Sequence, residues 1–425
     1  MATLADSSPA PHVLVVPCPA QGHMLALLDL TGLLASRGLR LTVVATPATA
    51  PQLAPLLSAR SRSRSPPTTP CPRASRAPSI CPRRSSSPSP ASAARSSPGP
   101  ELVRTARTAW SPCSPTSSAA GRNRWLPSSA YRGSCSRHVA LYRTFREGDD
   151  VSEGLRRNYL WNLDSSGGFV LNTFRRLEER YLEAPLADMG FLRARAVVPL
   201  APMADAAGNR GGEADVAAAD LCAWLDGFDD ASVVYVCFGS MAVLQEPHAA
   251  AMAVALDRTR VAFVWAAGPT APLPDGFEER VAAAGGRGTV VRGWAPQVAA
   301  LRHRAVGWFV THCGWNSVLE ATDAGVAMLA WPMTADQFVN ARLLVDELRA
   351  AMPVSWAGHK EAPGADEVAR VLDDAVNGRR WAEVASRVKE LADEAAAAAL
   401  RPGGNSWREL ARELRELGCE PRQRT

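Results

Sequence analysis

Polar and aromatic residues recur at close spacing in the second half of the chain. They form the segments Trp294-Ala295-Pro296-Gln297 and His312-Cys313-Gly314-Trp315-Asn316-Ser317, followed by Glu320 and then by Asp336-Gln337. An apolar run from Gly307 to Thr311 precedes the second segment, and a helical pattern begins at Trp315. A loop between a strand and a helix presents free backbone N–H groups and the positive end of the helix dipole, which suit a diphosphate.

Side-chain donors add to this predicted anion site. His312, Asn316 and Ser317 can each donate to a phosphate oxygen, and Gly314 lets the backbone approach a ligand closely. Taken alone, Trp294 is more often a core residue and His312 more often a loop histidine with a structural partner. The joint spacing of all these residue types is hard to obtain by accident, so we interpret the segment as a binding site.

A second candidate for chemistry is His23, in the turn-rich segment after the first apolar strand. Ligands of open α/β sheets bind outside the carboxyl ends of the strands, which is where this position is expected. A histidine titrates near neutral pH, so it can take the proton of an attacking hydroxyl group. The alternative is a histidine that caps the following helix. His12 precedes the strand and is interpreted as structural.

Two series of strands and helices must position these residues. In the first, strands are expected from Val13 to Val16 and from Leu41 to Ala45, with a leucine-rich helix between them. The second contains the predicted strands Val233–Phe238, Val261–Trp265, Gly288–Val291 and Gly307–Thr311, and the predicted helices Pro247–Leu256 and Trp315–Ala324. This alternation predicts an α/β protein with two doubly wound domains of parallel sheet.

Shorter elements and boundaries complete the predicted organisation. They are a strand at Gly168–Asn172, a helix at Phe174–Ala184, a strand that includes Val197-Val198, and an amphipathic helix at Ser406–Leu417. Asn405 or Ser406 is the expected N-cap of the last helix. The predicted domains are 1–201 and 218–402, joined by a linker at 202–217 and followed by a C-terminal helix at 403–425.

The segment 59–138 does not fit this pattern. Of its 80 residues, 47 are Arg, Ser or Pro and only four are branched aliphatics. Such a composition cannot build a core, so the segment is predicted to be disordered and the N-terminal domain to be incomplete. With 14 Arg and one Glu, the segment carries a net charge of +13, so the rest of the chain carries −8. The overall charge of +5 therefore does not favour a nucleic-acid partner.

Codon bias offers an origin for this segment. The chain has two Lys and 45 Arg, a bias typical of GC-rich coding DNA, which yields Arg, Pro, Ser and Ala when it is read in the wrong frame. We interpret 59–138 as an out-of-frame stretch. The alternative is a genuine Arg/Ser region, because Arg60 to Ser65 resembles an RS-type segment of RNA-associated proteins.

The segment from Trp294 to Gln337 resembles the plant secondary product glycosyltransferase signature of family 1 UDP-glycosyltransferases over its whole length. The resemblance covers Pro11–Ser58 and roughly Leu141–Gly418, and the sequence around Asn158 to Glu183 looks closest to flavonol-type glucosyltransferases. It implies a GT-B fold, in which two Rossmann-like domains face a cleft. One departure is Ala327, where the family usually has Pro; we expect this to be a loop detail.

The resemblance implies a nucleoside end of the site. Trp294 would stack on uracil, and the backbone around Ala295 would read the edge of the base. Gln297 and Glu320 would hold the ribose hydroxyls.

It also implies a diphosphate end. His312, Asn316 and Ser317 would contact the phosphates at the start of the helix that opens with Trp315. Ser240 follows a strand in a loop that resembles the phosphate-side loop of the family, so it would add a contact.

At the sugar end, the resemblance gives Asp336 and Gln337 the sugar hydroxyls, and a terminal Gln favours UDP-glucose over UDP-galactose. The implied reaction transfers glucose to a hydroxyl of a small phenolic such as a flavonoid. It would be inverting and independent of metal, consistent with the lack of an Asp-x-Asp motif. No cofactor is expected beyond UDP-glucose as donor substrate.

The resemblance makes His23 the catalytic base, but its expected partner is missing. In the family an Asp further along the N-terminal domain binds this His. Here no Asp lies between Asp29 and Asp149, and the acids in that gap are Glu101 and Glu147. We therefore expect weak or absent transfer by this chain, and the alternative function is that of a UDP-sugar-binding remnant.

The remaining expectations concern location and class. The nine Cys contain no CxxC pair, which favours reduced thiols and a cytoplasmic location. We expect no signal peptide, membrane span or metal site, and no nucleic-acid partner. A nicotinamide-dependent enzyme is disfavoured because no GxGxxG follows either first strand.

Overall fold

The computed structural model describes residues 12–15, 21–36, 39–44, 153, 169–183, 194–197, 214–240, 244–378, 382–398 and 404–416. Its largest sheet has six strands: β5 (Val233–Cys237), β6 (Ala262–Ala266), β7 (Gly288–Val291), β8 (Val306–Thr311), β9 (Ala327–Ala330) and β10 (Ala351–Pro353). Every neighbouring pair is parallel. The spatial order is β10-β9-β8-β5-β6-β7, so the chain builds from the middle to one edge and then to the other. This order is that of a doubly wound sheet.

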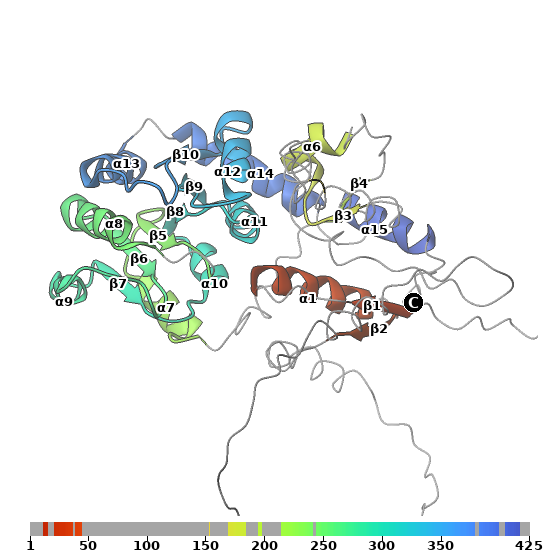
Figure 1. Ribbon diagram of the computed structural model, residues 1–425, viewed down its shortest axis with the longest axis horizontal. Coiled ribbons are helices and arrows are strands. Elements are labelled where there is room, and N and C mark those ends of the chain that lie inside the picture. Colours follow the sequence, from red (N-terminus) through yellow and green to blue (C-terminus); the bar gives the residue numbers. More distant parts are fainter. Residues whose placement is uncertain are drawn as a thin grey trace, which may run out of the picture. The chain divides into compact units, whose positions relative to one another are not determined.

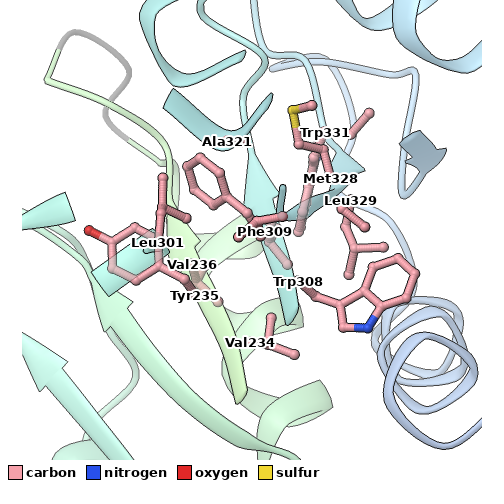
Figure 2. Packing of buried hydrophobic residues seen from close by; sticks show 14 of the residues in the cluster. Val234, Tyr235, Val236, Leu301, Trp308, Phe309, Ala321, Met328, Leu329 and Trp331 are labelled. Atoms are coloured by element: carbon pink, nitrogen blue, oxygen red, sulfur yellow. The ribbon is translucent and has the colours of Figure 1, made fainter. Parts of the chain in front are cut away.

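The strands of this sheet are apolar on both faces. In β5 the residues from Val233 to Val236 are all buried, as expected where helices cover both faces of a parallel sheet. Figure 2 shows the core that results, in which the rings of Tyr235 and Phe309 from neighbouring strands lie 5.3 Å apart between centroids. Full burial of one such large side chain stabilises the fold by roughly 1.5–3 kcal/mol.

Helices alternate with these strands. They are α7 (Ala218–Leu225), α8 (Glu246–Thr259), α9 (Phe277–Ala283), α10 (Gln297–Leu301), α11 (Trp315–Ala324), α12 (Gln337–Arg342), the π-helix η4 (Leu343–Glu347), α13 (Ala365–Asn377) and α14 (Ala382–Ala398). In Figure 1, α8 and α13 lie together on one side of the strands, and α10, α11 and α14 lie on the other. Gly325 ends α11 with a φ of +70°, a conformation common at helix C-termini.

Two short parallel pairs precede this sheet in the chain. The strands β1 (His12–Val15) and β2 (Arg40–Val43) flank α1 (Gln21–Ser36) in sequence. The strands β3 (Phe169–Leu171) and β4 (Ala194–Ala196) likewise flank α6 (Arg175–Glu183). One hydrophobic cluster joins them to the last helix, α15 (Asn405–Glu416); its members include Val13, Val15, Leu27, Leu30, Val170, Val197, Leu410 and Leu414. The end of the chain therefore packs with residues from its beginning.

Most predicted elements are confirmed to within a few residues. β7 and α11 have the predicted bounds, and the first strand-helix-strand unit is parallel as predicted. β9 and β10 were not predicted. The segment 59–138 and residues 202–213 of the predicted linker lie outside the described residues.

Three predictions of local structure were wrong. The strand expected at Val197 ends at Ala196, although the Val197 N–H still donates to the Leu171 carbonyl at 2.9 Å; Val198 lies outside the described residues. Ala327 is not in a loop: two residues after Gly325 the chain enters β9, where Ala327 pairs with Trp308.

The last helix also begins earlier than predicted. Asn405 and Ser406 are its first two residues and follow Gly404, whose carbonyl accepts the Arg408 N–H. The Asn405 side chain accepts a hydrogen bond from the Arg408 guanidinium instead of capping the backbone.

Candidate functional site

Four loops at the carboxyl edge of the six-stranded sheet carry residues of the predicted motif. They follow β5, β7, β8 and β9. β5 and β8 are neighbours in the sheet, and the chain order reverses between them. A doubly wound sheet binds its ligands at such a switch point. Gly239 and Ser240 follow β5 and His312 follows β8, so the predicted diphosphate residues flank this point.

The His312 ring lies between two glycines. A Cβ atom at Gly239 would lie 2.6 Å from the ring atoms Cε1 and Nε2, and one at Gly314 would lie 2.4 Å from Nε2. Gly239 also has a φ of +77°, in the left-handed region that favours glycine. Both glycines are therefore required for the imidazole to occupy its position.

His312 is electrically neutral in this environment. Burial lowers its pKa to about 4, and the Asp336 carboxylate partly opposes that shift. A neutral imidazole has one nitrogen that donates and one that accepts. Its Nδ1 is buried and has no hydrogen-bond partner among the residues that the structure describes. The ring can thus offer a hydrogen bond to a ligand at neutral pH without carrying a charge.

The N-terminus of α11 forms the next part of the site. Gly314 is its N-cap, and the Gly314 carbonyl accepts the first intrahelical bond from Val318 at 3.0 Å. The N–H groups of the first turn have no acceptor within the helix, so they are suited to an anion. Asn316, which is half-buried, and Ser317, which is buried, belong to this turn.

Trp315 differs from its neighbours in this turn. Its side chain is buried, and its Nε1 donates to the backbone oxygen of Asn172 at 2.7 Å. The indole therefore packs inside the protein, and only the backbone of Trp315 can serve a ligand. Ser240, by contrast, is exposed at the end of β5.

Gln297 and Glu320 meet across two helices. The Gln297 amide, at the start of α10, donates to Glu320 Oε2 on α11 at 2.7 Å, and the charge of the acceptor strengthens this bond. Trp294 is half-buried just before α10, and its backbone oxygen accepts the Asp215 N–H at 3.0 Å. Ala295 is buried, and its carbonyl accepts the Gln297 N–H at 2.8 Å. The structure thus joins the two side chains that were predicted to share a role.

Asp336 and Gln337 lie where α12 begins. Asp336 is the N-cap and is half-buried. Gln337 is buried, and its Oε1 accepts the N–H groups of Met333 at 2.9 Å and of Thr334 at 3.0 Å. These two bonds fix the amide, so the NH₂ group is the part of Gln337 that can bind a hydroxyl.

Asn340 is a residue of this site that the sequence analysis missed. It is fully buried on α12, and its Nδ2 donates to the Cys313 carbonyl at 3.0 Å and to Asp336 Oδ2 at 3.2 Å. A signal was present, because residues four apart on a helix are neighbours and Asn340 follows Asp336 by four.

His23 is the third residue of α1, after β1, so its backbone has the predicted place in the chain. Its side chain lies outside the described part of the structure, as do Glu101 and Glu147. The geometry of the predicted base is therefore not part of the described site.

Within the described ranges, no group of three or more His, Cys, Asp or Glu side chains is placed to hold a metal ion. Burial raises the pKa of Cys237 to about 11 and that of Cys313 to about 12, so both thiols stay protonated and are poor nucleophiles. No helix in the same ranges is long and apolar enough to cross a membrane.

Known proteins resemble this chain in sequence. The family model described as UDP-glucoronosyl and UDP-glucosyl transferase matches residues 187–389. A relative named flavonol 3-O-glucosyltransferase UGT89B1, from Arabidopsis thaliana, is 36% identical over 94% of this chain and 94% of its own length.

Solved structures resemble it as well. Arabidopsis thaliana UGT89C1 complexed with UDP-L-rhamnose is 30% identical, with a TM-score of 0.72 over 96% of this chain and 100% of that protein. The same protein complexed with quercetin gives 28% identity and a TM-score of 0.67 over the same shares of the two chains.

Proposed function

Because the chain belongs to the UDP-glycosyltransferase family and has its GT-B fold, we propose that it binds UDP-glucose at the carboxyl edge of the six-stranded sheet and transfers glucose to a small phenolic acceptor. One observation carries the proposal. The loop from His312 to Gly314 opens α11 at the switch point of a doubly wound sheet, and the remaining motif residues except Glu320, which lies in the middle of α11, are in loops and helix starts that follow β7, β8 and β9.

The nucleoside would bind next to α10. Trp294 would stack on uracil, and the backbone at Ala295 would bind the edge of the base. Gln297 and Glu320 would hold the ribose hydroxyls. The Gln297–Glu320 hydrogen bond supports this role, because it fixes both side chains before the ligand arrives.

The diphosphate would lie at the start of α11. The neutral His312 ring, the side chains of Asn316 and Ser317, and the first-turn N–H groups at Trp315 would donate to its oxygens. Ser240 would add a hydroxyl from the exposed loop after β5. Such preorganised donors stabilise the negative charge that UDP gains as the leaving group.

The sugar would lie against Asp336 and Gln337. A carboxylate accepts hydrogen bonds from hydroxyls, and the Gln337 NH₂ group donates to them. We propose glucose as the sugar. Rhamnose is the competing donor, because a related structure is a complex with UDP-L-rhamnose.

His23 would act as the base. The acceptor oxygen attacks the anomeric carbon from the side opposite to UDP, and His23 takes the acceptor proton. The bond from the anomeric carbon to the diphosphate oxygen breaks, and its electron pair leaves with UDP. The product is inverted at the anomeric carbon. Flavonols are the proposed acceptors, since the names of relatives include a flavonol glucosyltransferase and a complex with quercetin.

The proposed organisation places the acceptor in an N-terminal domain at 1–201 and the donor in a domain at 218–402, joined by 202–217 and followed by the helix at 403–425. We also propose a cytoplasmic location. Cys222, Cys237 and Cys313 are free thiols in the described part of the chain, which is typical of a reducing compartment.

A second candidate function is that of a UDP-sugar-binding protein with impaired catalysis. The observation that favours it is the absence of any Asp between Asp29 and Asp149, where the family places the partner of the base. The donor site does not depend on that partner, so binding would persist without turnover.

The experiment combines binding and transfer. The purified chain is titrated with UDP and then incubated with quercetin and UDP-glucose, UDP-rhamnose or UDP-galactose, with products separated by mass. We expect saturable UDP binding and a trace of glucoside. A rhamnoside as the main product would overturn the donor assignment, binding without any product would leave the second candidate, and no UDP binding would overturn both.

A further inference from the structure

Asn340 contacts the diphosphate part and the sugar part of the proposed donor site through one nitrogen atom. Its side chain is fully buried, and the two hydrogens of its Nδ2 serve the Cys313 carbonyl at 3.0 Å and Asp336 Oδ2 at 3.2 Å. We propose that Asn340 is a positioning residue, which holds the diphosphate loop and the sugar-binding carboxylate in one fixed arrangement. This inference rests on the donor site proposed above.

The first contact orients the diphosphate loop. The peptide between Cys313 and Gly314 is planar and trans, so its carbonyl and its N–H point in opposite directions. Asn340 holds the carbonyl and thereby aims the N–H of Gly314, the N-cap of α11, away from the core. That N–H is one of the groups that a helix leaves for an anion.

The loop needs such a restraint. Cys313 has a φ of +61°, a left-handed conformation that residues other than glycine adopt rarely and at a cost in energy. Its N–H donates to Thr311 Oγ1 at 3.2 Å, and its carbonyl is held by Asn340. Removal of the amide would free one side of this residue and let the loop relax toward a more common conformation.

The second contact orients the sugar-binding carboxylate. Asp336 precedes Asn340 by one helical turn, and the amide holds its Oδ2. A carboxylate with a fixed oxygen presents the other oxygen in a defined direction. The Asp336 carboxylate also opposes the fall in the pKa of His312, so its charge acts on the diphosphate loop as well.

A second Asn–Asp hydrogen bond with the same sequence spacing lies outside the site. On α13 the Asn377 amide donates to Asp373 Oδ1 at 2.8 Å, with the same spacing of four residues. This pair is exposed and is far in sequence from the motif. Asn377→Ala is therefore the control for removal of an Asn–Asp contact on a helix.

The test compares the affinities of three ligands, uridine, UDP and UDP-glucose, in which first the diphosphate and then the sugar is added. Kd values for uridine, UDP and UDP-glucose are measured with the full chain, with Asn340→Ala, with Asn340→Leu, which keeps the branching of the side chain but no polar atom, and with Asn377→Ala. For both Asn340 variants we expect uridine affinity within about twofold of wild type and UDP affinity about tenfold weaker, as for the loss of one well-placed hydrogen bond. The affinity of UDP-glucose relative to UDP should fall further, and Asn377→Ala should change none of the three.

The pattern across the series separates positioning from simple folding. Equal losses for uridine, UDP and UDP-glucose would show a general structural effect and overturn the proposal, as would unchanged Kd values for all three. If wild type binds none of the ligands, the donor site itself is wrong and the proposal fails with it.

Discussion

The proposed donor site and the region around the proposed catalytic base are built in different ways. The donor site belongs to one six-stranded sheet, and all its predicted residues except Ser240 fall within 44 residues of chain, from Trp294 to Gln337. The proposed base is on α1, next to a two-stranded pair whose hydrophobic cluster is completed by Leu410 and Leu414 of α15. The proposed donor site depends on residues that are close in sequence. The region around the proposed base depends on contacts between distant parts of the chain.

This difference predicts which functions would survive if part of the chain failed to fold. A site made from the loops of one sheet depends mainly on the folding of that sheet, although Trp315 also donates to the backbone oxygen of Asn172. A base with an orienting acid requires two segments that meet across a long stretch of sequence, and here that stretch contains no Asp from residue 30 to 148. Nucleotide-sugar binding is therefore expected to be more robust than catalysis.

The largest expected effect concerns the base. His23→Ala should abolish the trace of glucose transfer to quercetin, because a general base contributes about 10²-fold or more to the rate, while the Kd for UDP stays unchanged. Transfer is followed by product mass and binding by calorimetry. Unchanged turnover would show that His23 is not the base. A matching loss of UDP affinity would contradict the claim that the donor site is independent of His23.

The next effect tests the long-range contacts. Arg195 on β4 is buried and bonds to Glu413 at 2.9 Å and to Glu409 at 3.0 Å, both on α15. Arg195→Leu removes both charge-assisted hydrogen bonds and leaves two partly exposed carboxylates, so it should cost about 2 kcal/mol of unfolding free energy in urea.

The control for Arg195 is an exposed ion pair. Arg176 lies 3.5 Å from Glu394, and both side chains are 48% exposed. Arg176→Leu should therefore cost under about 1 kcal/mol. Equal effects of the two substitutions would mean that α15 does not stabilise the N-terminal strands through Arg195.

A smaller effect is expected at the nucleoside end. Trp294→Ala should weaken UDP binding by about 1–3 kcal/mol, the usual contribution of one base stacked on an aromatic ring. Trp407→Ala, on α15, replaces a half-buried tryptophan outside the motif and should leave the Kd for UDP unchanged. Similar losses from both variants would argue against stacking at Trp294.

An effect of similar size depends on pH. The pKa of His312 is about 4 in the folded chain, below the ordinary value near 6.5. Between these values the unfolded chain binds a proton that the folded chain excludes, so stability falls as the pH drops through this window. The loss should amount to roughly 1–3 kcal/mol.

Thermal melting at a series of pH values checks this expectation. His312→Gln should flatten the dependence of Tm on pH between 6.5 and 4. A slope that survives in His312→Gln would assign the proton to another group.

Sequence patterns predicted the donor half of the molecule well, because its signals are local. The bounds of β7 and α11 follow from apolar runs and from the glycines beside them. β9 and β10 were missed: β9 is four residues that begin and end with Ala, and β10 is three residues at the sheet edge that end in Pro353. Only the neighbouring strands give these short runs an extended conformation.

In the candidate site, too, the local features were predicted and the contacts between distant residues were not. The motif predicted which residues gather at the sheet edge, but not that the Trp315 indole would turn inward to Asn172, 143 positions earlier. It also gave no sign that the His312 ring would lie against Gly239, because the two are neighbours only through the pairing of β5 with β8. Contacts made by strand order cannot be seen in a local pattern.

The most direct test of the central claim is a calorimetric titration of the full chain with UDP, beside Trp294→Ala. We predict saturable binding with one site per chain, which Trp294→Ala weakens, whether or not any glucose transfer is detected. The absence of saturable binding by the folded wild-type chain would contradict the claim that this sheet edge is a nucleotide-sugar site.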